Sequence, residues 1–259
     1  MLFTTTDIVS LINGLFWPLT RIAAMLAIAP IFGARMVPVK IRLILALLLT
    51  SVIVPTLPAM PPVDPLSPAG ALVLAQQLII GLAIGFSIQL VFATLVVAGQ
   101  TTAMGMGLGF ASMVDPQNGV QVPVVGQYYV VVATLLFLAM NGHLALIQVL
   151  VDSFRTLPVG VDALSRQELR EVAWWGGRMF AGAVMVALPA VAAILLANLS
   201  FGVVSRAAPQ LNIFGVGFPV IMTLGFVALM FIVPSLLPHL ERLLQDAFGA
   251  VGQFGRGGR

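Results

Sequence analysis

The chain has 259 residues, of which 60% are hydrophobic and 8% are charged, and its formal net charge is +3. Average soluble domains have roughly 25% charged residues, so this composition excludes an ordinary soluble enzyme and predicts an integral membrane protein. The basic excess does not indicate nucleic-acid binding, because the twelve basic residues are spread along the chain without the stripe that such binding requires.

Six long apolar stretches predict an all-α membrane fold. They cover residues 8–31, 41–57, 69–98, 124–151, 172–201 and 213–238. Each is expected to be helical, because a backbone exposed to lipid must satisfy its own hydrogen bonds. The third would be about 45 Å long, beyond a hydrocarbon core of about 30 Å, so it must tilt, bend or project from the bilayer. Internal prolines predict kinks in the later helices, at Pro189, Pro219 and Pro234.

The first two connections differ in chemistry. Arg35, Lys40 and Arg42 mark a short basic turn after the first stretch. The next connection, at residues 55–68, holds six prolines, which predict a stiff and extended connector.

The later connections are more polar. Residues 152–171 hold seven of the 21 charged side chains and are expected to lie in water. Within them, a capping-box pattern from Ser165 to Glu168 predicts that the fifth helix begins before residue 172. The polar tail, residues 241–259, is expected to be frayed. If all six stretches cross, seven basic residues lie on the side of the tail and four on the other, which predicts a cytoplasmic tail.

Arg21 is a charge in the middle of an apolar stretch, where it costs a few kcal/mol or more unless it is paired or hydrated. One interpretation is a contact to a partner subunit or to an aqueous pathway. The other is that Arg21 snorkels, or caps a helix that is broken at Pro18. An ion pair within the chain, with Asp7 or Asp115, is a further possibility.

The third stretch carries features that predict contacts with other helices. Amides in a membrane span usually face protein, so we expect partner contacts at Gln76, Gln77 and Gln89. Gly81 and Gly85 form a small-xxx-small pattern, which permits close approach of a second helix.

The segment 99–123 is apolar but makes a poor helix. It holds five glycines, three methionines and one charge. Each glycine costs a helix about 1 kcal/mol relative to alanine, so we expect an irregular loop packed inside protein at membrane depth. One hypothesis is a deformable plug in a pore, because an apolar constriction blocks water and ions by dewetting. The other is a re-entrant packing loop without a gating role.

The chemistry of an active site is missing from the sequence pattern. The two histidines, His143 and His239, have no ligand spacing around them, and the glycines at 105–109 do not form a phosphate-binding loop. We therefore expect no catalytic residue, no metal site and no cofactor.

Several short motifs resemble the FliR family of flagellar export-gate proteins, whose injectisome counterpart is the T-component of type III secretion. These motifs are NGLFWPLTR at 13–21, APIFG at 29–33, VPVKIR at 37–42 and the block at 99–127 with MGLGF and DPQ. The resemblance covers nearly the whole chain. The central block leans towards flagellar rather than injectisome cargo.

The resemblance implies a non-enzymatic gate subunit of the bacterial inner membrane, within the flagellar basal body. One FliR copy would assemble with several copies of FliP and FliQ, FlhB would wrap the closed gate, and unfolded flagellar subunits would pass through. The fold would be a set of kinked helical hairpins that resembles a fusion of a FliP-like and a FliQ-like part.

The resemblance also implies how the chain is divided. Residues 1–157 would form the FliP-like part, with a central plug loop at about 99–123. Residues 158–259 would hold the charged connector, the FliQ-like helical hairpin and a flexible polar tail. The family's loop plugs the closed pore, and the matching candidates for plug or gate residues are Met104, Gly105, Met106, Gly107, Leu108, Gly109, Phe110 and Met113.

Two other functions remain as alternatives. A secondary transporter would use broken helices around a binding site, but it should show an internal repeat and intramembrane carboxylates, and the sequence has neither. A structural assembly factor of another membrane complex is the third possibility.

Overall fold

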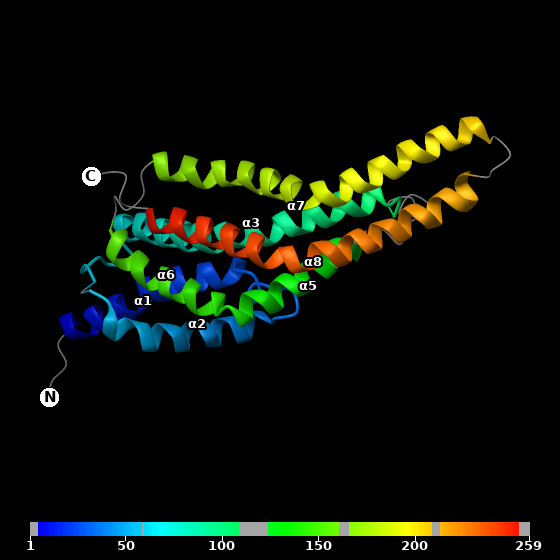
Figure 1. Cartoon of the computed structure of the whole chain (residues 1–259). Helices are drawn as coiled ribbons and strands as arrows, with labels where there is room; N and C mark the ends of the chain where they lie inside the picture. Colours follow the sequence, from blue (N-terminus) through cyan, green and yellow to red (C-terminus); the bar gives the residue numbers. More distant parts are fainter. Residues whose placement is uncertain (1–4, 59, 109–123, 161–165, 209–212, 254–259) are drawn as a thin grey trace. The chain divides into compact units, whose positions relative to one another are not determined.

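The protein is built from helices joined by turns. The computed structural model describes residues 5–58, 60–108, 124–160, 166–208 and 213–253. Within these ranges no strand occurs, and the predicted all-α membrane fold is confirmed. In chain order, the elements in Figure 1 are α1 (Thr5–Ile28), α2 (Val39–Ile53), the 3-10 helix η1 (Val54–Thr56), α3 (Pro68–Gly105), α5 (Val124–Ala139), α6 (Gly142–Thr156), α7 (Arg166–Ala207) and α8 (Ile213–Gln253).

Four helices in the described part of the chain are long and apolar enough to cross a membrane. Their apolar parts are Val39–Thr56, Pro68–Gly105, Ala173–Ala207 and Gly215–Gly252. A fifth span results if α5 and α6 are counted together as one broken span. The protein is thus an integral membrane protein, whereas the predicted count of six stretches is not confirmed.

The fourth predicted stretch, 124–151, is wrong as a single helix. It divides into α5 and α6 because Asn141 adopts the left-handed conformation, with φ of 57°. Asparagine tolerates this conformation better than most residues, and Gly142 follows it directly. The dipeptide Asn141-Gly142 was therefore a break signal inside an otherwise uniform apolar run.

The last two helices extend beyond the apolar stretches that hydropathy marks, α7 at its start and α8 at its end. Helix α7 begins at Arg166, which confirms the early start predicted from the capping-box pattern. Helix α8 continues to Gln253, so the prediction of a frayed tail from residue 241 is wrong over most of its length. The reason is an apolar stripe at helical spacing that stays buried, formed by Leu240, Leu244, Ala247 and Val251.

The chain packs as two compact units, each of which combines separate stretches of sequence. The first unit comprises Met1–Leu90, Met140–Gly176 and Leu244–Arg259, and the second comprises Val91–Ala139 and Gly177–Leu243. Helix α3 contributes its first part to one unit and its second part to the other.

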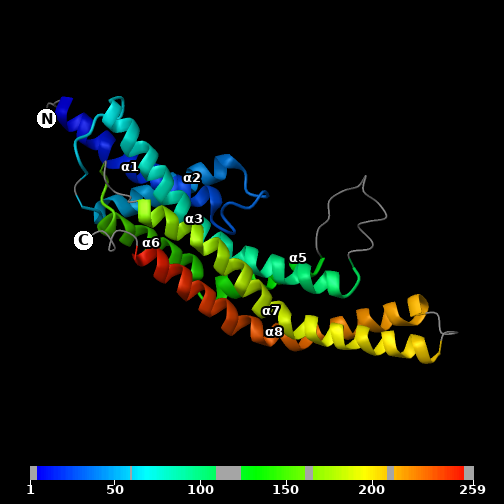
Figure 2. The ribbon, with the colours of Figure 1, turned by 90° about the horizontal axis from the view of Figure 1, so that it is seen from above.

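In the first unit, α1 and the beginning of α3 cross at very short distance, and Figure 2 shows the two helices side by side. A Cβ atom on Gly81 would collide with the backbone oxygen of Arg21, and one on Gly85 would lie 2.7 Å from the oxygen of Met25. The small-xxx-small pattern therefore permits the close approach that was predicted, and α1 is the helix that it meets.

In the second unit, α3 and α5 cross through another pair of glycines. A Cβ atom on Gly99 would lie 2.5 Å from the Cα atom of Gly126. Near the other end of α5, the ring of Phe137 packs edge to face with that of Phe92 on α3, with centroids 5.7 Å apart. Helix α7 adds a buried stripe at 3–4 residue spacing, formed by Ala183, Val186, Ala187, Ala190 and Ile194.

The glycine crossing in the first unit leads to a test. Gly81→Ala should destabilise the protein by about 1–3 kcal/mol, because the new methyl group meets a backbone atom that cannot move aside. The measurement is the melting temperature of the detergent-extracted protein. Gly14→Ala is the control, since a Cβ there meets no atom within 4 Å and replacing glycine in a helix stabilises by up to about 1 kcal/mol. Equal melting temperatures for the two variants would contradict the proposed crossing.

Candidate functional site

The first candidate site is the buried guanidinium of Arg21 on α1, whose side chain is 0% exposed. Its Nε donates to Oε1 of Gln77 on α3 at 2.8 Å. Its Nη1 donates to the backbone oxygen and the hydroxyl of Ser153 at 2.9 and 3.1 Å, and its Nη2 donates to the backbone oxygen of Leu157 at 2.9 Å. One side chain thus ties α1 to α3 and to the end of α6.

Neutral groups and a helix end stabilise this charge. Ser153 and Leu157 are the last turn and the C-cap of α6, so the guanidinium lies at the negative end of a helix dipole. The ring of Phe154 lies 4.2 Å from the Cζ atom of Arg21, which adds a cation–π contact. Among the described residues, Arg21 has no carboxylate partner, and these contacts take the place of an ion pair.

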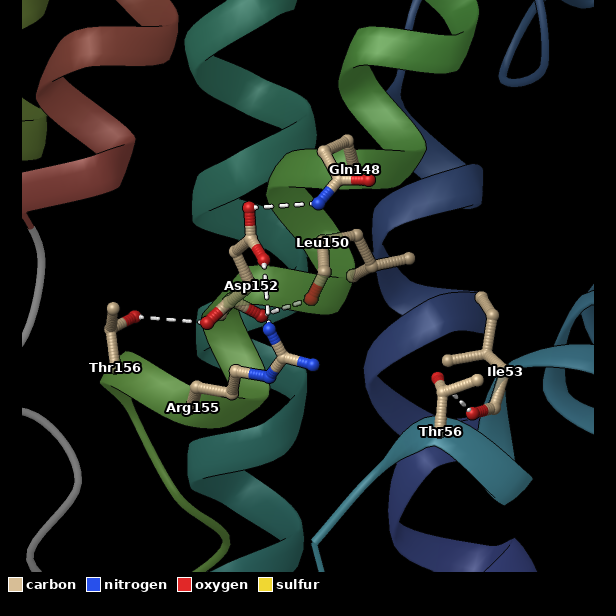
Figure 3. A network of polar contacts seen from close by, with 8 residues as sticks. Ile53, Thr56, Gln148, Leu150, Asp152, Arg155 and Thr156 are labelled. Atoms are coloured by element: carbon tan, nitrogen blue, oxygen red, sulfur yellow. Dashed lines mark hydrogen bonds and ion pairs between the residues drawn. The ribbon is translucent and has the colours of Figure 1, made fainter.

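The opposite face of the same α6 turn lies on the surface of the chain. Figure 3 shows Asp152 accepting from Nε2 of Gln148 at 3.1 Å and pairing with Arg155 at 3.9 Å. The Asp152 and Arg155 side chains are 49% and 65% exposed, so this pair contributes little to stability. The last turn of α6 therefore has one face on the surface of the chain and the other on Arg21.

The structure decides part of what the sequence left open about Arg21. Snorkelling is wrong, because the side chain is fully buried, and a helix broken at Pro18 is wrong, because α1 runs through this proline. The acidic alternatives, Asp7 and Asp115, lie where no side chain is described. A contact of Arg21 with a partner subunit or an aqueous pathway stays a prediction.

The three glutamines of α3 do not share one environment. Gln77 is buried against Arg21, Gln76 is half-buried, and Gln89 is exposed on the surface of the chain. Partner contacts at these glutamines stay a prediction, with Gln89 the most accessible of the three.

The second candidate site is the end of α3, where a glycine terminates the helix. Gly107 has a φ of 80°, which is the left-handed conformation. The amide of Gly107 donates to the oxygen of Met104 at 3.0 Å, and the amide of Leu108 donates to the oxygen of Ala103 at 3.0 Å. These two bonds are the Schellman pattern, which satisfies carbonyls at a helix end.

Met106, within this capped end, is buried on α8. Its side chain is 0% exposed and occupies the space that a Cβ atom on Gly225 would need, with Sδ and Cε at 2.8 and 2.7 Å from that position. Next to it lies an apolar cavity of about 670 Å³ between the ends of α3, α7 and α8. Its lining includes Met104, Phe201, Phe218 and Ile221, with Asn198 as a polar member.

The predicted plug residues are only partly described. Met104 is 64% exposed, Met106 is buried, and the residues at 105, 107 and 108 are half-buried. Gly109, Phe110 and Met113 lie outside the described residues. Helix α3 continues through Gly105, so the non-helical segment starts at Met106, seven residues later than the predicted position 99.

Metal ligation finds no support in the described ranges. These residues contain no group of three or more His, Cys, Asp or Glu side chains that could hold a metal ion. In the first candidate site a buried cation holds helices together, and in the second a capped helix end packs beside an apolar recess.

The Arg21 cluster leads to a first test at these sites. Arg21→Lys should destabilise the protein by about 3 kcal/mol or more, because an ammonium lacks the planar fork that reaches Gln77 and both α6 carbonyls. The melting temperature in detergent measures the effect. Arg35→Lys is the matched control, since Arg35 is exposed, and it should melt like the wild type. If both variants melt alike, the cluster does not hold the three helices together.

The contact between Met106 and Gly225 leads to a second test. Met106→Ala should cost about 2–5 kcal/mol, and Gly225→Ala about 1–3 kcal/mol because its methyl group displaces the methionine. In the double variant the methyl group of residue 225 enters the space left by the methionine side chain. The loss of stability should therefore be smaller than the sum of the two single losses by about 0.5 kcal/mol or more. Thermal stability of all four proteins gives the coupling, and additive effects would show that Met106 does not occupy this position.

Comparisons with known proteins agree with this architecture. Residues 12–247 match the family described as bacterial export proteins, family 1. The chain is 40% identical over 246 residues to the flagellar biosynthetic protein FliR of Escherichia coli (strain K12), which covers 95% of this chain and 94% of that relative. The proteins of the same name from Aquifex aeolicus (strain VF5) and Bacillus subtilis (strain 168) are 30% and 29% identical over 229 and 228 residues, which is 88% and 86% of this chain.

The matched region includes Arg21, all of α3 and α7, and α8 as far as residue 247, and so contains the residues that line the apolar recess. The resemblance seen in the short sequence motifs is confirmed over nearly the full length. The chain belongs to the FliR family, the bacterial export proteins, family 1.

Proposed function

We propose that this chain is the FliR subunit of a flagellar type III export gate, where it forms the pore entrance together with FliP and FliQ homologues. The observation that carries the proposal is the match to relatives named as flagellar biosynthetic proteins, which extends over 95% of the chain. The family is one of export proteins, and the proposed role is non-enzymatic.

The distribution of buried surface supports an assembly rather than an isolated chain. In the apolar window of α3, 61% of the residues are buried, against 17%, 28% and 22% in the windows of α2, α7 and α8. Large apolar faces on α2, α7 and α8 are therefore left for lipid and for sister subunits. A gate that contains one copy of this chain among several copies of FliP and FliQ homologues would cover part of these faces.

The end of α3 supports the proposed plug. Residues 104–108, the described part of the candidate plug, form the capped end of α3 next to the apolar cavity, with Met106 buried. An apolar, glycine-rich segment anchored at a rigid cap can fill a pore without bringing polar groups into it. In this proposal Phe110 and Met113 face the lumen, and exported unfolded flagellar subunits displace the segment.

The proposed division of the chain falls between two helices. Pro158 lies in the connector between α6 and α7, so residues 1–157 would end with α6 as the FliP-like part. The FliQ-like hairpin would then consist of α7 and α8. This division concerns resemblance to the two partner proteins, and it differs from the two compact packing units, which both draw on sequence before and after residue 158.

The remaining partners and the location belong to the same proposal. A FlhB homologue would contact the closed gate, and the complex would lie in the bacterial inner membrane within the flagellar basal body. The C-terminal end of α8 would face the cytoplasm, as the distribution of basic residues predicts.

The plug can be tested by deletion. Removing residues 109–118 leaves the cap of α3 intact and should make the assembled complex conduct ions, measured as conductance in planar bilayers. Removing residues 254–259 is the control and should leave the complex closed. Unchanged conductance after the first deletion would reject the plug. The same preparation tests the assembly, because a tagged chain should bring FliP and FliQ homologues with it, whereas a lone chain that transports a small solute would favour the transporter alternative.

A further inference from the structure

Helix α2 presents an almost completely unburied apolar face. Only Ala46, Thr50 and Ile53 are buried, and they form a single stripe at spacings of three and four residues. The opposite face is between 53% and 72% exposed, at Leu43, Ile44, Leu47, Leu48 and Val52. In water such a surface would be unfavourable, so another apolar phase must cover it.

The polar side chains of α2 are arranged for an apolar surrounding. The hydroxyl of Thr50 donates to the oxygen of Ala46 at 2.6 Å, and that of Ser51 donates to the oxygen of Leu48 at 2.8 Å. Thr56, in η1, does the same with Ile53, as Figure 3 shows. Since the hydroxyls are satisfied within the helix, the exposed face requires no polar partner along its length.

The N-terminal end of the same helix is strongly positive. Arg35, Lys40 and Arg42 lie within eight residues, and the sequence holds no acidic residue from 8 to 63. Lys40 is exposed one helical turn before Ile44, so it lies on the same face of α2, at the N-terminal end of the apolar surface. Among the described residues, neither Arg35 nor Lys40 has a carboxylate partner.

Arg42 holds this positive turn in place. Its Nη2 donates to the oxygens of Ala34 and Val37, at 2.8 Å each, and so ties the preceding loop to α2. The first turn of α2 has no acidic residue, and its N-cap, Pro38, provides no side-chain cap. Basic side chains at the positive end of a helix dipole are unfavourable by themselves, and an anion at this position would offset the repulsion.

The apolar part of this helix is long enough to span the hydrocarbon core of a bilayer once. The apolar part, Val39–Thr56, has 18 residues, which corresponds to about 27 Å and matches a hydrocarbon core of about 30 Å. When the exposed face lies among acyl chains, Lys40 and Arg35 therefore reach the headgroup layer. The chemistry that complements an apolar face ending in three cations is that of an acidic phospholipid.

We propose that α2 faces lipid and that Arg35 and Lys40, on a turn positioned by Arg42, bind the headgroup of an anionic phospholipid. The charge at the end of the face favours lipid over a protein partner, because a partner helix would need to supply carboxylates where the hydrocarbon ends. This inference does not depend on the proposed export role.

The test uses the complex extracted with the full-length chain and reconstituted into vesicles. Ile44→Trp, on the exposed face next to Lys40, reports lipid contact through quenching by brominated lipid, after subtraction of the signal from the unmodified protein. Vesicles contain either brominated phosphatidylglycerol or brominated phosphatidylcholine at increasing mole fraction. We expect half-maximal quenching by brominated phosphatidylglycerol at a mole fraction about fivefold or more below that needed with brominated phosphatidylcholine.

Charge variants identify the source of the preference. Arg35→Gln with Lys40→Gln should abolish the difference between the two lipids, while Arg206→Gln, at an exposed arginine outside this turn, should preserve it. Absence of quenching by either lipid would show that protein covers α2 and would overturn the proposal. Equal quenching by both lipids before any charge is removed, or a preference that survives the double variant, would overturn the headgroup site.

Discussion

The burial of one positive charge organises the first compact unit. The guanidinium of Arg21 connects helices that are far apart in the sequence, through Gln77 on α3 and the last turn of α6. An unpaired charge in the interior would cost several kcal/mol, so these helices can pack only where its donors find their acceptors. The crossing at Gly81 imposes the same register by shape. The position of α1 against α3 is therefore specified twice, by directional hydrogen bonds and by steric fit.

The second unit is held by a different kind of contact. Its described residues include no buried charge, and the specific features are a glycine crossing at Gly99 and a methionine placed over Gly225. Apolar contacts have no directional requirement, and methionine adapts to changes in its surroundings. A rearrangement in this unit would break dispersion contacts that can re-form elsewhere, whereas a rearrangement around Arg21 would leave a charge unpaired. The proposed moving part lies in the unit that tolerates movement at lower cost.

Local patterns predicted much of this architecture, and tertiary partners remained beyond their reach. The apolar stretches identified the helices, and the glycines at 81 and 85 identified a crossing, but only the folded chain shows that α1 is the helix they meet. Arg21 and Gln77 were singled out for separate reasons. They are 56 residues apart, and no local pattern in the sequence indicates that they form a hydrogen bond. Two errors came from signals that hydropathy averages away, namely the break at Asn141 and the buried stripe that continues α8 past residue 240.

The crossing of α3 and α5 also has a consequence for chain entropy. Gly99 and Gly126 bring the two helix backbones into contact, so the ends of the intervening segment are already held close together. Closing a loop between fixed ends becomes only slightly harder as it grows, by about 0.6 kcal/mol for each doubling of its length. Changes in chain length between residues 109 and 123 therefore alter the loop-closure entropy only slightly. The length of this part of the chain is thus only weakly coupled to the stability of the helices that carry it.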